Sequence, residues 1–208
     1  MARILIIDDD EGLREGLAET IADLGHTPEQ AEDGQRGLDR LAQGGIDAVL
    51  LDLRMPGMDG MEVLRRLRQT SELPVIILTS KDDEIDEILG FNLGADDYMH
   101  KPFSQRLLLE RVKAVLRRAR PDEDDPAAPG AAGAAGSKVM KRGKLTLDPA
   151  RHDSLWDGRP VRLTVTEFLL LQSLAQRPGF VKSRDNLMDA AYDDQVYVDD
   201  RTIDSHIK

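Results

Sequence analysis

Short apolar runs alternate with amphipathic segments along the first 119 residues. The runs are rich in Val, Ile and Leu, which is typical of strands buried on both faces. Between them, apolar residues recur every three or four positions, as in helices with one buried face. The pattern predicts strands at 3–7, 27–31, 46–51, 74–79 and 97–99 and helices at 11–24, 35–43, 61–69, 83–92 and 104–119. Alternating strands and helices build a parallel sheet with helices on both faces, so we expect an α/β domain over residues 1–119.

The pattern changes after residue 119. Residues 120–137 combine acidic residues with Ala, Gly and Pro and show no apolar periodicity, which predicts a flexible linker. Residues 138–208 predict a smaller α+β domain, with strands at 144–148 and 160–164 around the Asp157-Gly158 turn and helices at 163–177, at 183–191 and from about 200 onward. The first of these helices carries an apolar stripe that we expect to be core, formed by Phe168, Leu169, Leu171 and Leu174.

Composition excludes several classes of protein. The chain has no cysteine, which excludes a disulfide framework and thiolate chemistry. Its apolar runs are far shorter than the about 20 residues that a membrane-spanning helix needs. Asp8, Asp9 and Asp10 interrupt the apolar stretch near the N-terminus, so this stretch does not resemble a signal peptide. We therefore expect a cytoplasmic protein with no membrane partner.

The net charge of −11 does not by itself indicate a nucleic-acid partner. The acidity is uneven along the chain. Residues 121–137 contain four acidic and no basic residues, whereas residues 138–208 contain 12 Lys and Arg against 11 Asp and Glu. A nucleic acid would therefore have to bind the C-terminal domain.

Polar side chains gather where the predicted strands end. Asp8 and Asp9 follow the first strand, Asp52 follows the third, Thr79 closes the fourth and Lys101 follows the fifth. If the first strand is central, with the third and fourth beside it, these side chains converge at one edge of the sheet. Carboxylates without a nearby histidine or cysteine suit Mg²⁺. A lysine ammonium and a threonine hydroxyl would neutralise a phosphoryl group transferred to Asp52.

Four segments carry a resemblance to a known family. Together they are similar to the receiver domain of two-component response regulators, and they are Ile4–Glu11, Leu50–Gly60, Ile77–Ser80 and Gly94–Phe103. The resemblance covers about the first 119 residues. It implies a doubly wound, five-stranded parallel sheet of the CheY-like or flavodoxin-like kind.

The resemblance also implies a metal site. By analogy with the family, Asp52 is the phosphoacceptor, and Asp9 and Asp52 are direct Mg²⁺ ligands. Asp8 lies nearby and acts through water, and the backbone carbonyl of Arg54 is a further ligand. Asp10, in contrast, is expected to be only a helix cap.

Three further residues match the family's switch. Thr79 and Tyr98 resemble its paired switch residues, and Lys101 resembles its phosphoryl contact. The Lys101-Pro102 bond is expected to be cis, which proline permits at low cost. His100 is expected to lie at the surface or rim.

A dimer face is implied by the same family. It would consist of the fourth helix, the fifth strand and the fifth helix, and would carry the charged residues Asp96, Asp97, Arg111 and Arg118. Leu107 stands where the subfamily usually has another charged partner. Each exposed ion pair contributes only about 0–1 kcal/mol, so a network of pairs is required.

The C-terminal domain resembles the winged-helix effector of the OmpR/PhoB subfamily. Thr164–Leu171 and Gln195–Lys208 carry this similarity, and the second segment resembles the ChvI type of regulator. The third helix would then be the recognition helix in the major groove of double-stranded DNA. Contacts to phosphates are expected from Arg201, His206 and Lys208, and contacts nearer base edges from Asp204 and Ser205.

This sequence differs from the family's pattern at its C-terminal end. The family continues the recognition helix with more basic residues and adds a β-hairpin wing, whereas this sequence stops at Lys208. We therefore expect a winged-helix domain truncated at its C-terminus, with DNA affinity far below that of a version extended through the wing.

The resemblance in both parts of the chain implies a response regulator rather than an enzyme. A sensor histidine kinase would phosphorylate Asp52 with Mg²⁺, the receiver would dimerise, and the C-terminal domain would regulate transcription. One alternative is a phosphohydrolase that uses an aspartyl-phosphate, but such enzymes of the dehalogenase type place an Asp-x-Asp nucleophile after the first strand. A second alternative is a signalling or protein-interaction module without DNA binding.

Overall fold

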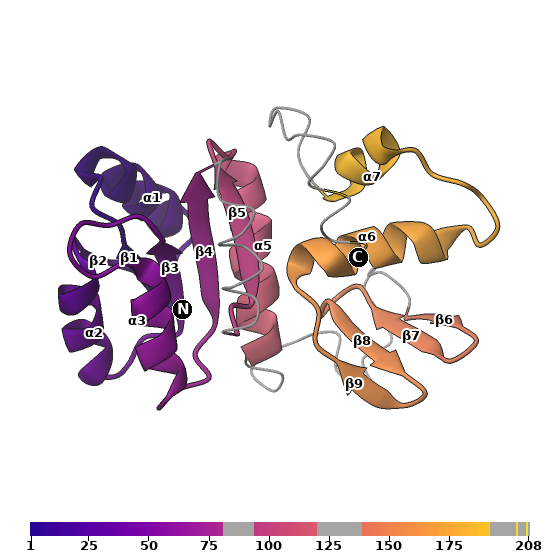
Figure 1. The fold of residues 1–208 in the computed structure, drawn as a ribbon, viewed down its shortest axis with the longest axis horizontal. Helices are drawn as coiled ribbons and strands as arrows, with labels where there is room; N and C mark the ends of the chain where they lie inside the picture. The colour runs from indigo at the N-terminus through magenta and orange to yellow at the C-terminus, as the bar shows by residue number, and fades with distance from the viewer. Residues whose placement is uncertain (81–93, 120–138, 192–202, 204–206, 208) are drawn as a thin grey trace. The chain divides into compact units, whose positions relative to one another are not determined.

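The computed structural model describes residues 1–80, 94–119, 139–191, 203 and 207 (Figure 1). These residues form two compact units, Met1–Val115 and Leu116–Lys208. The predicted helix at 83–92 and the predicted linker at 120–137 lie outside the described residues. None of the helices in the described part is long and apolar enough to cross a membrane.

The first unit is built on one parallel sheet with the strand order β2-β1-β3-β4-β5 (Figure 1). The five-stranded α/β prediction is confirmed. The strands are β1 (Arg3–Ile7), β2 (Thr27–Ala31), β3 (Ala48–Asp52), β4 (Val75–Ser80) and β5 (Asp97–Lys101), and the described helices are α1 (Glu11–Asp23), α2 (Gly34–Ala42), α3 (Gly60–Arg68) and α5 (Gln105–Ala119).

The central strand is β3, and β1 is the inner strand beside it, so the condition assumed for the convergence, with the third and fourth strands both next to the first, is met only for the third. β1 pairs with β2 on one side and with β3 on the other, and the sheet then grows through β4 to β5. β2 lies on one side of β1, and the later strands are added on the other side. β1 and β3 are therefore the neighbours at the topological switch point, where the strand order reverses. All five strands are parallel, so their carboxyl ends still meet at one edge.

Apolar side chains of the inner strands form the core of this unit. Ile4 to Ile7 of β1, Val49 to Leu51 of β3 and Val75 to Leu78 of β4 have no measurable exposure. Successive strand residues point to opposite faces of the sheet. Leu5, Ile7 and Val49 share a core cluster with Val63, Leu64 and Leu67, so α3 covers that face.

Aspartates begin three of the helices. The side chains of Asp10, Asp33 and Asp59 each accept a hydrogen bond from the backbone N–H three residues ahead, at 3.0, 2.8 and 2.8 Å. Such a cap satisfies one of the free N–H groups in the first helical turn and typically contributes about 1 kcal/mol. The prediction that Asp10 caps the first helix is confirmed.

The second unit opens with an antiparallel sheet in the order β6-β7-β8-β9. Its strands are β6 (Met140–Arg142), β7 (Leu145–Asp148), β8 (Asp153–Trp156) and β9 (Arg159–Val161). The sequence prediction missed β6 and β8. The Asp157-Gly158 turn, with Gly158 at φ +78°, joins β8 to β9. The two predicted strands correspond to β7 and β9, so β8 lies between them in the chain.

Two helices follow, α6 (Val165–Gln176) and α7 (Arg184–Ala191). Thr164 and Glu167 form a capping box at the start of α6. Phe168 is fully buried beside Leu147 of β7. The predicted apolar stripe is wrong at one position, because Leu174 is 41% exposed, while Leu170, which the stripe omitted, is 4% exposed.

Candidate functional site

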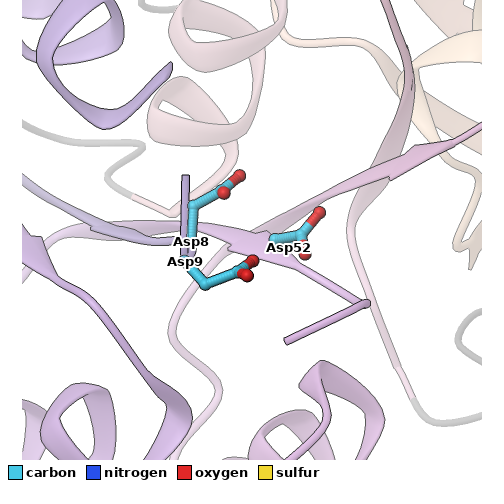
Figure 2. A group of neighbouring side chains, drawn as sticks. All are labelled: Asp8, Asp9 and Asp52. Atoms are coloured by element: carbon cyan, nitrogen blue, oxygen red, sulfur yellow. The ribbon is translucent and has the colours of Figure 1, made fainter. Parts of the chain in front are cut away.

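Three carboxylates meet at the carboxyl edge of the sheet. Asp8 and Asp9 directly follow β1, and Asp52 is the last residue of the neighbouring strand β3. Each offers an oxygen, and these three oxygens lie within 4.8 Å of one another (Figure 2). Asp8 and Asp52 are buried, whereas Asp9 is exposed. The structure therefore brings the three predicted carboxylates together.

Lys101 brings a cation into this group. It is the last residue of β5, and its Nζ donates to Asp8 Oδ2 at 2.7 Å and to Asp52 Oδ1 at 2.6 Å. The Lys101-Pro102 peptide is cis, as expected. One ammonium thus bridges the carboxylates that end two different strands.

Burial and charge act on Asp52 in opposite directions. Desolvation raises the pKa of the Asp52 carboxyl above its usual value, and the hydrogen bond and positive charge of Lys101 oppose this without cancelling it. Desolvation alone would lower the pKa of Lys101, but its hydrogen bonds to Asp52 and Asp8 outweigh this effect and raise it. Lys101 therefore stays protonated and can contact an anion.

The donor set fits a hard divalent cation. Three carboxylates and one ammonium carry a net charge of −2, which a divalent ion would neutralise. The oxygens come from Asp8, Asp9 and Asp52, and oxygen is the donor that Mg²⁺ prefers. The backbone N–H of Arg54 donates a hydrogen bond to Asp52, which orients that carboxylate. The predicted role of the Arg54 carbonyl stays a prediction.

Asp8 is held from several directions. Its backbone N–H donates to the carbonyl of Ala31 at 3.2 Å, and its Oδ1 accepts from the backbone N–H of Asp10 at 2.9 Å. Its carbonyl accepts from Arg14 Nη1 at 2.7 Å. Arg14 was missed by the sequence prediction. The available signal was a charged residue three positions before Leu17, on the buried face of the first helix.

Gly60, at the start of α3, was also recognised only as part of a turn. Its N–H donates to the carbonyl of Leu53 at 2.9 Å. A Cβ at this position would lie 2.1 Å from the carbonyl oxygen of Asp52 and 2.8 Å from Cα of Leu53. The close approach of α3 to the end of β3 therefore requires glycine.

The two predicted switch residues lie on adjacent strands. Thr79 is 1% exposed near the end of β4, and Tyr98 is 4% exposed on β5, where it joins the core cluster. The ring of Tyr98 thus already packs inside. His100 pairs with Thr79 in register and is 9% exposed, so the expectation of a surface or rim position is wrong.

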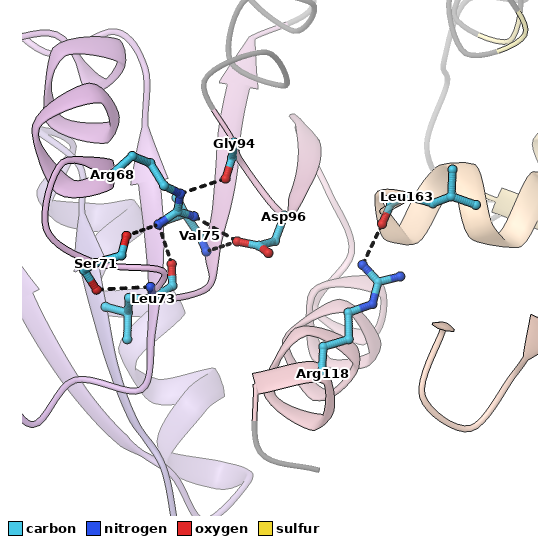
Figure 3. A network of polar contacts seen from close by, with 8 residues as sticks. All are labelled: Arg68, Ser71, Leu73, Val75, Gly94, Asp96, Arg118 and Leu163. Carbon is cyan, nitrogen blue, oxygen red and sulfur yellow. Dashed lines mark hydrogen bonds and ion pairs between the residues drawn. The ribbon is translucent and has the colours of Figure 1, made fainter. Parts of the chain in front are cut away.

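The predicted dimer residues divide into two groups. Asp97 and Arg111 form an ion pair of 2.6 Å within the chain and are 0% and 1% exposed, which corrects the expectation that they form exposed pairs between chains. Asp96 lies at 3.0 Å from Arg68, which also donates to the carbonyls of Gly94 and Leu73 (Figure 3). Arg118 lies in the last turn of α5, and its dimer role stays a prediction.

The predicted DNA contacts lie outside the described residues. They are Arg201, Asp204, Ser205, His206 and Lys208. Between them, Ile203 and Ile207 are helical, and Ile203 is buried against Leu170, Leu187 and Ala191.

Comparison with protein families gives two matches. The response regulator receiver domain matches residues 4–113. The C-terminal domain of transcriptional regulatory proteins matches residues 158–208. The acidic site lies within the first match and α6 and α7 within the second.

Curated relatives match over nearly the whole chain. The transcriptional regulatory protein CpxR of Escherichia coli (strain K12) is 41% identical over 207 residues, which is 100% of this chain and 87% of CpxR. The transcriptional regulatory protein BaeR of Escherichia coli O6:H1 is 38% identical over 206 residues, which is 99% of this chain and 81% of BaeR.

Solved structures agree with these matches. The response regulator DrrB of Thermotoga maritima, an OmpR/PhoB homologue, is 29% identical with a TM-score of 0.53, and the similarity covers 100% of this chain and 87% of DrrB. The receiver domain of the Francisella response regulator 1452 is 32% identical with a TM-score of 0.55, covering 58% of this chain and 100% of that domain.

Proposed function

The chain belongs to the OmpR/PhoB family of two-component response regulators and acts as a transcription factor, and we propose that Asp52 is the residue that switches it. Its receiver domain implies a histidine kinase as partner, and its C-terminal domain implies DNA binding. The observation that carries the proposal is the convergence of Asp8, Asp9 and Asp52 on one ammonium group, that of Lys101.

The proposed reaction is transfer of one phosphoryl group to Asp52. An oxygen of the Asp52 carboxylate attacks the phosphorus, the bond from phosphorus to the kinase histidine nitrogen breaks, and the imidazole leaves with the electron pair. Lys101, already 2.6 Å from Asp52, would pair with a phosphoryl oxygen as negative charge accumulates. Burial of Asp52 strengthens that interaction because the surroundings screen charge less than water does.

Mg²⁺ is the cation we assign to this site. Asp9 and Asp52 would bind it directly, together with the Arg54 carbonyl, and Asp8 would act through water. When bound, the ion supplies positive charge that offsets the carboxylates and the incoming phosphoryl oxygens. The exposed position of Asp9 leaves this side of the site open to a hydrated ion.

We further propose that Thr79 responds to phosphorylation of Asp52. Its buried hydroxyl, at the end of β4, would donate to a phosphoryl oxygen on Asp52. Movement of Thr79 would change the position of Tyr98, because β4 and β5 are adjacent and paired. The proposed result is dimerisation through the face that includes β5 and α5, with Asp96 and Arg118 as its charged residues.

We propose domain boundaries that keep the elements whole. α5 continues to Ala119, and β6 begins at Met140. We therefore assign residues 1–119 to the receiver, 120–137 to a linker and 138–208 to the winged-helix DNA-binding domain. Two copies of that domain held in one dimer would bind a repeated DNA site at a raised effective concentration.

Metal-dependent labelling tests the proposed function. The chain is incubated with acetyl phosphate and MgCl2, with or without EDTA, and intact mass and light scattering are followed. We expect one phosphoryl group per chain and a shift toward dimer, both abolished by EDTA. Continuous release of phosphate from phosphomonoesters, with no stable label, would favour the phosphohydrolase instead. Labelling that is unaffected by EDTA would contradict the metal site.

A further inference from the structure

Arg14 is a buried cation next to the acidic site. It is the fourth residue of α1 and is 8% exposed. Its Nη1 donates to the backbone carbonyl of Asp8 at 2.7 Å, and among the described residues its guanidinium forms no ion pair with a carboxylate. Burial of a guanidinium without such a partner is unfavourable. Its presence here therefore favours a role connected with the carbonyl it holds.

The turn from β1 to α1 is fixed on both sides of Asp9. On one side, the Asp10 N–H donates to Asp8 Oδ1 at 2.9 Å. On the other side, Asp10 Oδ1 caps α1 by accepting from the Leu13 N–H at 3.0 Å. The Asp8 carbonyl, which is the peptide oxygen directly before Asp9, is held by Arg14. Arg14 thus connects the first turns of α1 to the backbone that carries both carboxylates.

We propose that Arg14 is a positioning residue for metal binding, which fixes the peptide between Asp8 and Asp9 so that the two carboxylates meet Asp52. This inference rests on the proposed function of the site. Asp9 needs such support most, because its side chain is exposed while those of Asp8 and Asp52 are buried. A bond to a carbonyl is well suited to this role, since it fixes the backbone and leaves the carboxylates available.

The direction in which Mg²⁺ affinity changes when Arg14 is replaced distinguishes a positioning role from a purely electrostatic one. Arg14 is a cation beside a cation site, so if it acted only through its charge, its neutralisation would tighten Mg²⁺ binding. If it positions the turn, its removal loosens Asp8 and Asp9, and binding weakens. The two roles therefore predict opposite changes in Mg²⁺ affinity.

The test compares Arg14→Met with the wild-type chain. Isothermal titration with MgCl2 gives the dissociation constant, and acetyl phosphate labelling is followed over a range of Mg²⁺ concentrations. We expect Arg14→Met to weaken Mg²⁺ binding about tenfold, the size of effect typical for residues that orient metal ligands. Labelling should recover at high Mg²⁺, so that the half-saturating concentration rises while the maximal rate changes little.

Arg68→Met is the matched control. Arg68 is a similarly enclosed arginine that holds the carbonyls of Gly94 and Leu73 and the carboxylate of Asp96, none of which belongs to the acidic site (Figure 3). We expect this variant to lose stability but to keep the wild-type affinity for Mg²⁺. An equal loss of affinity in both variants would overturn the inference, because it would then reflect general destabilisation.

Two other outcomes are decisive. Unchanged or tighter Mg²⁺ binding by Arg14→Met overturns the inference and leaves the proposed function intact. Absence of saturable Mg²⁺ binding by the wild-type chain contradicts the proposed function itself. If Arg14→Met does not fold, Arg14→Gln replaces it: glutamine removes the charge and is too short to hold the Asp8 carbonyl in the same way, so weaker binding supports positioning, and unchanged or tighter binding overturns it.

Discussion

At the scale of single residues, the balance of charge around Asp52 decides what the site can bind. Lys101 bridges Asp52 and Asp8 and so offsets part of their mutual repulsion. Asp9 adds a third carboxylate on the exposed side. The excess negative charge favours a divalent cation, and the ammonium favours an anion next to it. A phosphoryl group on Asp52 would meet both preferences, with Lys101 pairing with its charge and the carboxylates holding the cation.

Gly60 permits the close packing behind Asp52, and Gly60→Ala tests it. The added methyl group would lie 2.1 Å from the Asp52 carbonyl oxygen, so backbone must shift. We expect a loss of about 1–3 kcal/mol in the free energy of unfolding and slower labelling of Asp52. Urea unfolding and acetyl phosphate labelling measure the two effects.

Gly16→Ala is the control for this substitution. Gly16 lies within α1, and a Cβ there meets nothing within 4 Å. This variant should gain up to about 1 kcal/mol through the lower backbone entropy of alanine in a helix. Equal stability of Gly60→Ala and wild type would refute the account of this contact.

Asp97 and Arg111 form a buried ion pair, and Arg111→Met tests its contribution. The substitution leaves the buried Asp97 carboxylate without Arg111, which typically costs about 3–5 kcal/mol. We expect a large drop in the urea midpoint, and partial recovery in the double variant Asp97→Asn/Arg111→Met because the buried charge is then removed as well. A fully stable Arg111→Met chain would instead support a role for Arg111 between chains.

Sequence patterns predicted the acidic residues and missed their supports. Asp8, Asp9 and Asp52 could be found because they directly follow buried apolar runs, and parallel strands bring their ends together. Arg14 could not, and the buried partner of Arg111 could not, because helical periodicity gives the face of a residue but not the group it touches. The partner of Arg14 is a backbone carbonyl, which no side-chain pattern reveals.

At the scale of elements, the ends of β1 and β3 are each coupled to the helix that follows, α1 and α3. Asp10 and Asp59 cap α1 and α3, and these helices follow β1 and β3, whose carboxyl ends carry Asp8 and Asp52. The caps fix where each helix starts, and the short connections then fix the direction of Asp8 and Asp52. The site is thus built on rigid elements rather than on long loops.

The β2–α2 connection offers a pH-dependent test, because Glu29 of β2 forms a two-pronged ion pair with Arg40 of α2. The hydrogen bond from Arg40 lowers the pKa of Glu29 below its unfolded value. The stabilisation is therefore fully present above the unfolded pKa and disappears as the pH falls through the folded pKa. We expect Glu29→Gln to lose about 0.5 kcal/mol at neutral pH, a small value because the pair is partly solvated.

Urea unfolding as a function of pH measures this effect. The difference between Glu29→Gln and wild type should vanish in acid, where Glu29 is protonated in both states. Glu19→Gln serves as a control, since Glu19 is exposed on α1 and forms no ion pair among the described residues. A deficit of Glu29→Gln that persists at low pH would show that the ion pair is not its cause.

Elements with strong apolar patterns were predicted well, and short polar ones were not. The positions of β1, β3 and β4 follow from uninterrupted apolar runs. β6 and β8 have only three and four residues and few buried side chains, so their existence depends on pairing with β7. Strand order was also beyond the sequence pattern, because a parallel crossover can place a strand on either side of its predecessor.

At the scale of the whole molecule, the two family matches cover different parts of the chain. The acidic site lies within residues 4–113, and the match to transcriptional regulators lies within residues 158–208. CpxR and BaeR, which match nearly the whole of this chain, are transcriptional regulatory proteins, so both parts of the chain match within one regulator. Two domains were predictable because the composition changes sharply between them, whereas the predicted DNA contacts lie outside the described residues.

The most direct test is the position of the phosphoryl group. Wild type, Asp52→Asn and the control Asp39→Asn, an exposed aspartate on α2, are treated with acetyl phosphate and MgCl2, and intact masses are recorded. We expect one added phosphoryl group on wild type and on Asp39→Asn, and none on Asp52→Asn. Equal labelling of all three chains would contradict the assignment of Asp52 as the phosphoacceptor.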